Sequence, residues 1–196
     1  RSGERRVRDK FVASARHWMD VDICHYSPDP LRQDGQIAHS ANHATGGVTP
    51  SHMWVEGLLD YYHHTGEQRA LDLAVGIGKN VMRQLDSPKF SQDGQSSVRE
   101  IGWALRTCSA LYTETHDEAW LEQCEWVISH FFSWKETYGS WLSYYTDHSM
   151  IRIPFMISVA VGSVMRYYRV RPSDELKELM LFAVDDMLEH CILPSG

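Results

Sequence analysis

HSANHATGGVTPSHMWVEGLLDYYHHTG, residues 39–66, is the stretch that decides the fold. It begins as a Gly-rich loop with two histidines and an asparagine, and a third histidine follows just after the loop. Thr49-Pro50 then supplies an N-cap residue and a proline suited to a first helical turn. We therefore expect a helix over 50–65 that ends at Gly66, with polar groups gathered at its N-terminus. Its packing face carries residues at helical spacing: Trp54, Gly57, Leu58, Tyr61 and Tyr62.

Helical periodicity continues along the rest of the chain. No segment shows the alternation of a half-buried strand, so the sequence predicts an all-α fold. Ser97 and Glu100 have the spacing of a capping box, which marks one helix start. The segment 153–168 is apolar all round and is expected to be buried on every side. The predicted helices cover about 4–19, 50–65 and 153–168, with four more around 70–85, 101–112, 120–131 and 176–188.

The helices are connected alternately by long loops and short turns. When the helix ends are aligned, Tyr62, Tyr112 and Tyr168 fall in register, about 50 and 56 residues apart. Each tyrosine is followed within a few residues by the next helix. We interpret this as a diverged repeat of helical hairpins, with an irregular helical bundle as the alternative.

Composition limits the class of protein. The 196 residues include 43% hydrophobic residues and carry a formal charge of -7, which suits one domain with a core and argues against nucleic-acid binding. The longest apolar stretch, 153–164, is too short to cross a bilayer. The four cysteines are far apart and form no zinc-ribbon or disulfide pattern, although Cys108 and Cys124 could face each other between neighbouring helices.

The ends of the chain do not identify its compartment or its companion domains. It starts at Arg1 without a methionine and stops just after a helix, so it looks cut at both ends. The compartment is undetermined. A soluble protein, secreted or periplasmic, fits the composition, and companion domains or self-association are expected.

The helical hairpins and the His-rich loop together resemble a known family of helical domains. The run SHMWVEGLLDYYHHTGEQRALDLAVGIGKNV, residues 51–81, resembles the toroid domains of the six-hairpin glycosidase-like superfamily, where a Trp-x-Glu-Gly-Leu run and a Tyr-Tyr…Thr-Gly-Asp/Glu turn recur. DVDICHY, residues 20–26, and the His-rich loop look most like the toroid domain of rhamnogalacturonan exolyase-like polysaccharide lyases. The resemblance implies an α/α toroid of about three and a half hairpins, so that 1–196 is a single toroid domain or a fragment of one.

On such a toroid the long loops and the N-termini of the inner helices share one mouth, where helix dipoles favour anions. The resemblance therefore implies a polysaccharide or oligosaccharide substrate, expected to be an acidic, pectin-type glycan. Trp103 and Trp141 are the expected sugar platforms. The other residues that the loops would deliver for substrate binding are His39, His52, Asp93, Arg99, Tyr145 and His148.

β-Elimination from a uronide needs a neutralised carboxylate, a base and a proton donor. Asn42 with Arg99 or Arg152 could neutralise the carboxylate. Histidine titrates near neutral pH, so His43 is the candidate base. Tyr144 or Tyr145 would protonate the leaving oxygen. The leading hypothesis is thus a polysaccharide lyase-like enzyme.

Three alternatives stay open. Glu56 could act as a general acid with Asp93 or Glu100, which would make a glycoside hydrolase on the same scaffold. A non-catalytic helical-repeat domain that binds a glycan or a protein is the second alternative. No cofactor is required, but His39 and His43 could share a divalent metal, with His52 or Asp22 completing the site, and this is the third.

Overall fold

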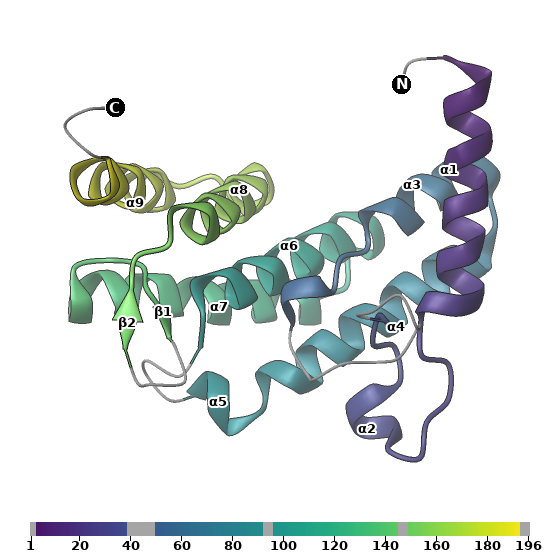
Figure 1. Ribbon diagram of the computed structural model, residues 1–196, viewed down its shortest axis with the longest axis horizontal. Helices are drawn as coiled ribbons and strands as arrows, with labels where there is room; N and C mark the ends of the chain where they lie inside the picture. Colours follow the sequence, from purple (N-terminus) through teal and green to yellow (C-terminus); the bar gives the residue numbers. More distant parts are fainter. Residues whose placement is uncertain (1–2, 39–49, 92–95, 145–148, 193–196) are drawn as a thin grey trace. The chain divides into compact units, whose positions relative to one another are not determined.

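The computed structural model describes residues 3–38, 50–91, 96–144 and 149–192 (Figure 1). Helices dominate this part of the chain, which confirms the predicted all-α class. The chain forms two compact units, residues 1–84 and 85–196, and each is described by itself. None of the helices in the described ranges combines the length and hydropathy that spanning a bilayer requires.

The first unit contains α1 (Arg5–His17), α2 (Pro30–Gln33), α3 (Glu56–Thr65) and α4 (Gln68–Leu85, which crosses the unit boundary by one residue). A π-helical turn, Trp18–Asp22, continues α1, and α1 packs on α3. Gly57 permits this approach, since a Cβ there would lie 3.0 Å from the ring of Trp18.

The helix expected over 50–65 is interrupted in the structure. A 3-10 turn covers Pro50–His52, and α3 begins only at Glu56. Between them Met53 and Val55 are 1% and 0% exposed. Residues 53–55 belong to no helix, and the burial of Met53 and Val55 anchors this break between the 3-10 turn and α3.

The front half of the predicted long loop, residues 20–38, is ordered by backbone pairing and by α4. The amide of Cys24 donates to Gln36 O, and that of Gly35 to Cys24 O, each at 2.8 Å. Asn80 on α4 donates to the carbonyls of Arg32 and Asp34 at 3.0 and 2.9 Å. Gly35 has φ 82°, and a Cβ there would lie 2.4 Å from a backbone oxygen of α4. Only glycine therefore lets this loop dock.

The second unit contains α5 (Pro88–Ser91), α6 (Val98–Thr115), α7 (Glu118–Tyr138), α8 (Pro154–Val170) and α9 (Asp174–Cys191). Two short antiparallel strands, β1 (Ser143–Tyr144) and β2 (Met150–Ile151), lie in the long connection before α8. In this unit α6 packs on both α7 and α8, and α8 packs on α9 (Figure 1). A Cβ on Gly102 would lie 2.9 Å from Cα of Ala160, so glycine sets how closely α6 and α8 approach.

Two turns of the predicted repeat share their hydrogen bonds. Gly66 closes α3 and His116 closes α6, both in the left-handed conformation, and their amides donate to the carbonyls of Tyr62 and Tyr112. The third member is shifted, since the amide that closes α8 donates to Tyr167 O rather than to Tyr168 O. The hairpin register is thus confirmed for the first two turns and corrected by one residue for the third.

Helix α8 differs from its prediction. One stripe is buried: Ile157, Ala160, Ser163, Val164 and Tyr167. Phe155 and Met165 are 57% and 46% exposed. The expectation of burial on every side was wrong because α6 and α9 cover only part of its circumference.

Cys108 and Cys124 do face each other, as the sequence suggested. Both are free and buried on α6 and α7. A hydrogen bond with Cys124 and burial raise the pKa of the Cys108 thiol well above its usual range. The Cys108 side chain therefore stays a neutral thiol at physiological pH.

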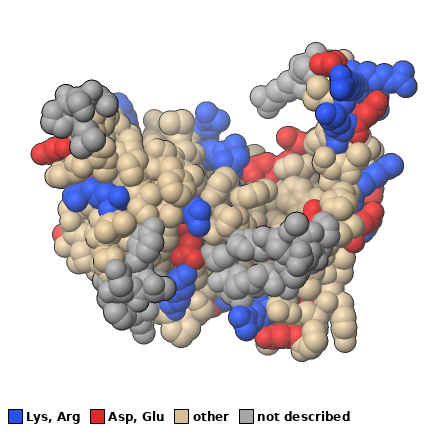
Figure 2. Space-filling model, in the orientation of Figure 1, with Lys and Arg blue, Asp and Glu red and all other residues tan. Residues whose placement is uncertain are grey.

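The basic run at the N-terminus is a solvated surface. On the face shown in Figure 2, basic and acidic side chains are interspersed along α1. Arg5 and Asp9, for example, form an exposed pair at 4.0 Å. Such a mixed surface contributes little to stability and does not form a band for a polyanion.

Candidate functional site

The N-terminal end of α6 is where the connection before α8 meets a helix of the second unit. Val98 donates its amide to Leu142 O at 3.2 Å, and the hydroxyls of Ser97 and Ser143 lie 3.4 Å apart. Met156, at the start of α8, accepts from Ser143 at 3.1 Å. The start of α6, the β1 strand and the start of α8 therefore meet, as the prediction of a shared mouth requires within this unit.

Glu100 occupies the first turn of α6 and completes the predicted capping box. Its carboxylate accepts the amide of Ser97 at 3.1 Å and the ammonium of Lys89 at 2.7 and 2.9 Å. Glu100 is only 8% exposed. Because both carboxylate oxygens are engaged, Glu100 holds the end of α5 to α6 and is poorly placed to exchange a proton with a substrate. Lys89 was missed because no local pattern links it to Glu100.

One stripe of α6 remains accessible. Arg99, Trp103 and Arg106 lie at i, i+4 and i+7, so they share a face, and all three are half-buried. The guanidinium of Arg106 lies 4.9 Å from the ring centroid of Trp103, and that of Arg99 lies 5.8 Å from the ring of Phe155. Arg99 and Trp103 were predicted site residues. Sequence reasoning missed two residues here. Phe155 lies in an apolar run and carried no signal, whereas the helical spacing of Arg106 from Arg99 could have identified Arg106.

Arg152 forms an ion pair with Asp186. Its Nε and Nη2 donate to Asp186 on α9, which also accepts from Ser140 at 2.5 Å and lies 3.2 Å from the ring of His190. Burial acts to raise the pKa of Asp186, but the hydrogen bonds from Arg152 and Ser140 outweigh it and leave that pKa lowered. The structure therefore gives Arg152 a structural role and corrects the prediction that it neutralises a substrate carboxylate.

Trp141 is a core residue. It is 0% exposed, its Nε1 donates to Phe131 O at 3.2 Å, and its ring lies 4.5 Å from that of Phe131. A ring without an open face cannot stack on a sugar, so the prediction of a platform at Trp141 was wrong. Of the two tryptophans proposed, the structure leaves Trp103 partly open.

Three further candidates are each placed by the structure within their own unit. Tyr144 lies in β1 opposite Met150 and is half-buried. Glu56 is the first residue of α3 and is also half-buried. The ring of His52, in the 3-10 turn, lies 6.0 Å from that of Trp54. Glu56 and His52 belong to the first unit and Tyr144 to the second.

The remaining predicted residues lie outside the described residues: His39, Asn42, His43, Asp93, Tyr145 and His148. Their roles stay predictions, as does the metal site that involved two of them. Within the ranges that the structure describes, no group of three or more His, Cys, Asp and Glu side chains is arranged to hold a metal ion.

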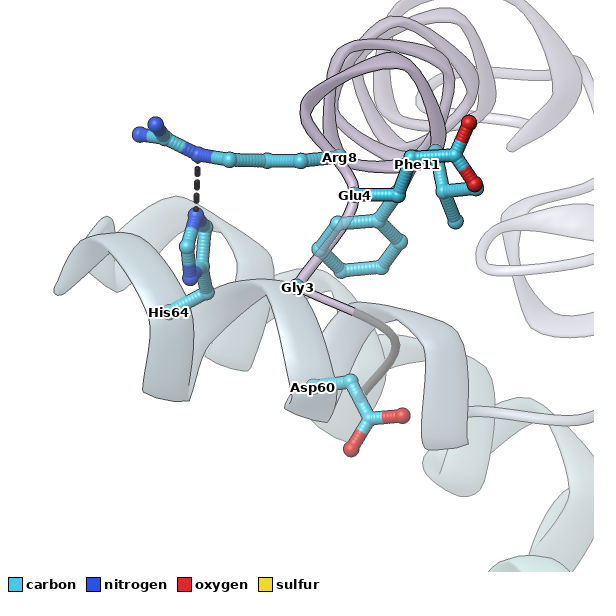
Figure 3. Close-up of a pocket in the computed structure, with 7 residues that line it drawn as sticks. Gly3, Glu4, Arg8, Phe11, Asp60 and His64 are labelled. Carbon is cyan, nitrogen blue, oxygen red and sulfur yellow. Dashed lines mark hydrogen bonds between the residues drawn. The ribbon is translucent and has the colours of Figure 1, made fainter.

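The first unit also has a cavity of about 440 Å³ between α1 and α3 (Figure 3). Arg8 donates from Nε to Nε2 of His64 at 3.0 Å across its edge, and Phe11 lies beneath, 6.2 Å from the same imidazole. Asp60 completes the α3 side. No local pattern predicts this hollow, because it forms between helices that are distant in the chain.

Comparisons with known proteins bear on the family. No curated protein and no solved structure was found to match the chain. The profile of the β-L-arabinofuranosidase GH127 catalytic domain matches residues 38–191, which is most of the chain. This match supports the predicted six-hairpin glycosidase-like superfamily, and it supports the glycoside hydrolase alternative rather than the lyase. The chain therefore belongs to the family of β-L-arabinofuranosidase GH127 catalytic domains.

Proposed function

We propose that this protein hydrolyses glycosidic bonds of β-L-arabinofuranosides. The observation that carries the proposal is the family match over residues 38–191, which takes in the Gly-rich loop and all of α3 to α9. The carbohydrate substrate follows from the same match. The lyase hypothesis loses one of its two candidate arginines, because Arg152 is engaged by Asp186.

Hydrolysis of a glycosidic bond commonly uses carboxyl groups that protonate the leaving oxygen and assist attack on the sugar. Glu56 is the better candidate of the two glutamates considered, because Glu100 has both oxygens engaged by Lys89 and Ser97. Glu56 is the first residue of α3 and is half-buried.

The test is a comparison of chromogenic substrates with the purified protein. Aryl β-L-arabinofuranoside, aryl α-L-arabinofuranoside and aryl β-D-galactopyranoside would be incubated in parallel, together with pectic uronate polymers. We expect aryl release from the β-L-arabinofuranoside alone, with no new ultraviolet absorbance from an unsaturated uronide. Appearance of that absorbance on the polymers without aryl release would establish elimination and overturn the proposal.

Variants then test the role of Glu56. We expect Glu56→Gln to lower kcat by about a hundredfold or more, as removal of a catalytic carboxylate does. Glu178→Gln is the matched control, since Glu178 is an exposed glutamate on α9. Equal turnover in the two variants would remove Glu56 from the mechanism. Binding of arabinosides without turnover in the unaltered protein would instead favour the non-catalytic scaffold.

A divalent metal held by His39, His43 and His52 is part of the same proposal. Imidazole nitrogens suit zinc, and the histidines bracket the loop that precedes α3. Elemental analysis of the purified protein before and after dialysis against a chelator tests it. A protein that holds less than a tenth of an equivalent of any divalent metal after purification in metal-containing buffer would contradict it.

A further inference from the structure

His130 on α7 lies between two backbone carbonyl groups of the second unit. Its Nδ1 is 3.0 Å from the carbonyl oxygen of Trp126, one turn earlier on α7, and its Nε2 is 2.8 Å from that of Phe90 on α5. The ring of His130 is half-buried, and its centroid lies 4.1 Å from that of the Trp126 ring. The imidazole therefore joins α5 to α7 through the Phe90 carbonyl.

The two contacts together require a charged imidazole. A carbonyl oxygen accepts hydrogen bonds and cannot donate one, so each contact needs a hydrogen on the nitrogen of the ring. Neutral imidazole has one N–H and imidazolium has two, so only the charged form donates to both carbonyls. The Trp126 carbonyl also accepts the hydroxyl of Ser129 at 2.6 Å, which leaves this count unchanged. The neighbouring indole is a favourable contact for a cation.

His64 in the first unit shows the opposite requirement. Its Nε2 accepts a hydrogen bond from Nε of Arg8 at 3.0 Å. A guanidinium has donors and no acceptor, so this nitrogen of His64 must carry no proton. The hydrogen bonds of His64 and His130 thus depend on opposite protonation states, which makes His64 the natural control for His130.

One other tether holds α5 in place. The ammonium of Lys89 donates to both carboxylate oxygens of Glu100 on α6, at 2.7 and 2.9 Å. The side chain of Phe90 is 2% exposed, so this short helix is also anchored in the core. Lys89 is paired with Glu100, and Asp86, which precedes α5, is exposed. The ammonium next to Phe90 is therefore balanced by a carboxylate and does not oppose a charge on His130.

The charged side chains of α7 nearest to His130 in the sequence are engaged elsewhere. Positions 126, 127, 133 and 134, which share its face one turn away, hold no charged residue. Glu125 lies 3.6 Å from Arg171, and the ammonium of Lys135 lies 5.1 Å from the ring centroid of Phe182. The two carbonyl groups and the indole are thus the partners that distinguish the two forms of His130.

We infer that His130 is a pH-dependent clamp between α5 and α7 that is complete only when its imidazole is charged. Loss of the proton removes one of the two hydrogen bonds and takes the charge from the other. A contribution that needs the protonated form is present at low pH and is lost as the pH rises through the titration of His130. Lysine and glutamate ordinarily keep their charges near neutral pH, so the Lys89–Glu100 pair remains and α5 is loosened without being released. The inference goes beyond the proposed function and does not depend on it.

Hydrogen exchange of the Phe90 amide, which donates to Ser87 O at 3.0 Å, reports how firmly α5 is held. Exchange would be compared in the unaltered full chain and in His130→Phe, which keeps a ring and has no donor. Nitrogen-15 NMR of the histidine rings identifies the pH at which His130 loses its proton, within a series from about pH 5 to about pH 9. Below that pH, we expect the substitution to accelerate Phe90 exchange by about tenfold or more, as for a charged hydrogen bond. Above it, the acceleration should be less than about threefold.

His64→Phe is the matched control and should leave exchange of the Phe90 amide unchanged at every pH. An acceleration in His130→Phe that is the same below and above the titration of His130 would overturn the inference. So would no acceleration at either pH, or an equal acceleration in His64→Phe.

A measurement on the unaltered protein keeps the test valid if His130→Phe does not fold. Leu105 of α6 is 0% exposed and supplies a reference amide in the same unit. The ratio of the Phe90 exchange rate to the Leu105 exchange rate should rise about tenfold as His130 loses its proton. The ratio cancels the general effect of pH on amide exchange. A ratio that stays constant across the titration of His130 would show that α5 is held equally by both forms and would reject the clamp.

Discussion

Arg152 and Asp186 face each other with two parallel hydrogen bonds, Nε to Oδ2 at 3.0 Å and Nη2 to Oδ1 at 3.0 Å. Asp186 is 7% exposed and belongs to α9, whereas Arg152 precedes α8. Ser140, just after α7, donates to the same carboxylate. One buried carboxylate therefore ties both ends of the connection between α7 and α8 to α9.

Asp186→Asn should lower the free energy of unfolding by about 2 kcal/mol at neutral pH, because it leaves the Arg152 charge without its partner. The folded pKa of Asp186 is lowered. Its contribution is therefore fully present above the ordinary Asp pKa of about 3.9 and is lost as pH falls through the lowered folded value. Denaturant unfolding from about pH 2 to pH 7 measures this, because that range includes the ordinary pKa of Asp. Asp185→Asn, at an exposed neighbour, is the control. A difference between Asp186→Asn and the unaltered protein that stays constant to the lowest pH would contradict the assignment.

Trp103 and Trp141 should respond in opposite ways to truncation. Trp141→Ala removes a fully buried indole and its hydrogen bond to Phe131, and should lower the free energy of unfolding by about 3–5 kcal/mol. Trp103→Ala should cost less than about 1.5 kcal/mol, since Trp103 is only half-buried, but should weaken glycan binding. Thermal unfolding and calorimetric titration measure the two effects. Comparable stability losses with unchanged glycan binding would show that both tryptophans serve packing alone.

Gly102→Ala and Gly162→Ala form a matched pair on adjacent helices. The added methyl at 102 would lie 2.9 Å from Cα of Ala160, so the backbone would have to move. We therefore expect the free energy of unfolding to fall by about 1–3 kcal/mol. At 162 nothing lies within 4 Å, and alanine favours the helix, so we expect a gain of about 0.5–1 kcal/mol. Urea unfolding of both variants checks this. Equal effects would mean that α6 and α8 are not in close contact in solution.

The turns that end α3 and α6 allow two opposite substitutions to be compared, glycine to alanine at 66 and histidine to glycine at 116. Gly66 has φ 72° with open space around its Cα, so Gly66→Ala should cost about 1 kcal/mol through backbone strain alone. His116 has φ 55°, and His116→Gly should relieve similar strain, offset in part by the greater freedom of glycine in the unfolded chain. We expect a net gain of about 0.5 kcal/mol. Thermal unfolding measures both, and a loss in His116→Gly would show that the edge contact of its ring with Tyr112 outweighs the strain.

The sequence by itself determined the features that depend on neighbours within a turn or two. Apolar periodicity located the main helices, and the Ser97–Glu100 spacing located the start of α6. The register of Tyr62 with Tyr112 anticipated two turns with the same hydrogen bonds. These are local properties, because helix hydrogen bonds and caps join residues that are close in the chain.

Tertiary structure alone decided which of these residues face solvent and which are engaged. Trp103 and Trp141 look alike in sequence, yet only Trp103 keeps an accessible side. Arg152 resembled a substrate-facing cation until Asp186, 34 residues away, was found against it. The apolar circumference of α8 gave no sign of which side its neighbours would leave uncovered. Burial and ion pairing between distant segments depend on how helices pack, and that packing is not encoded in the spacing of any single segment.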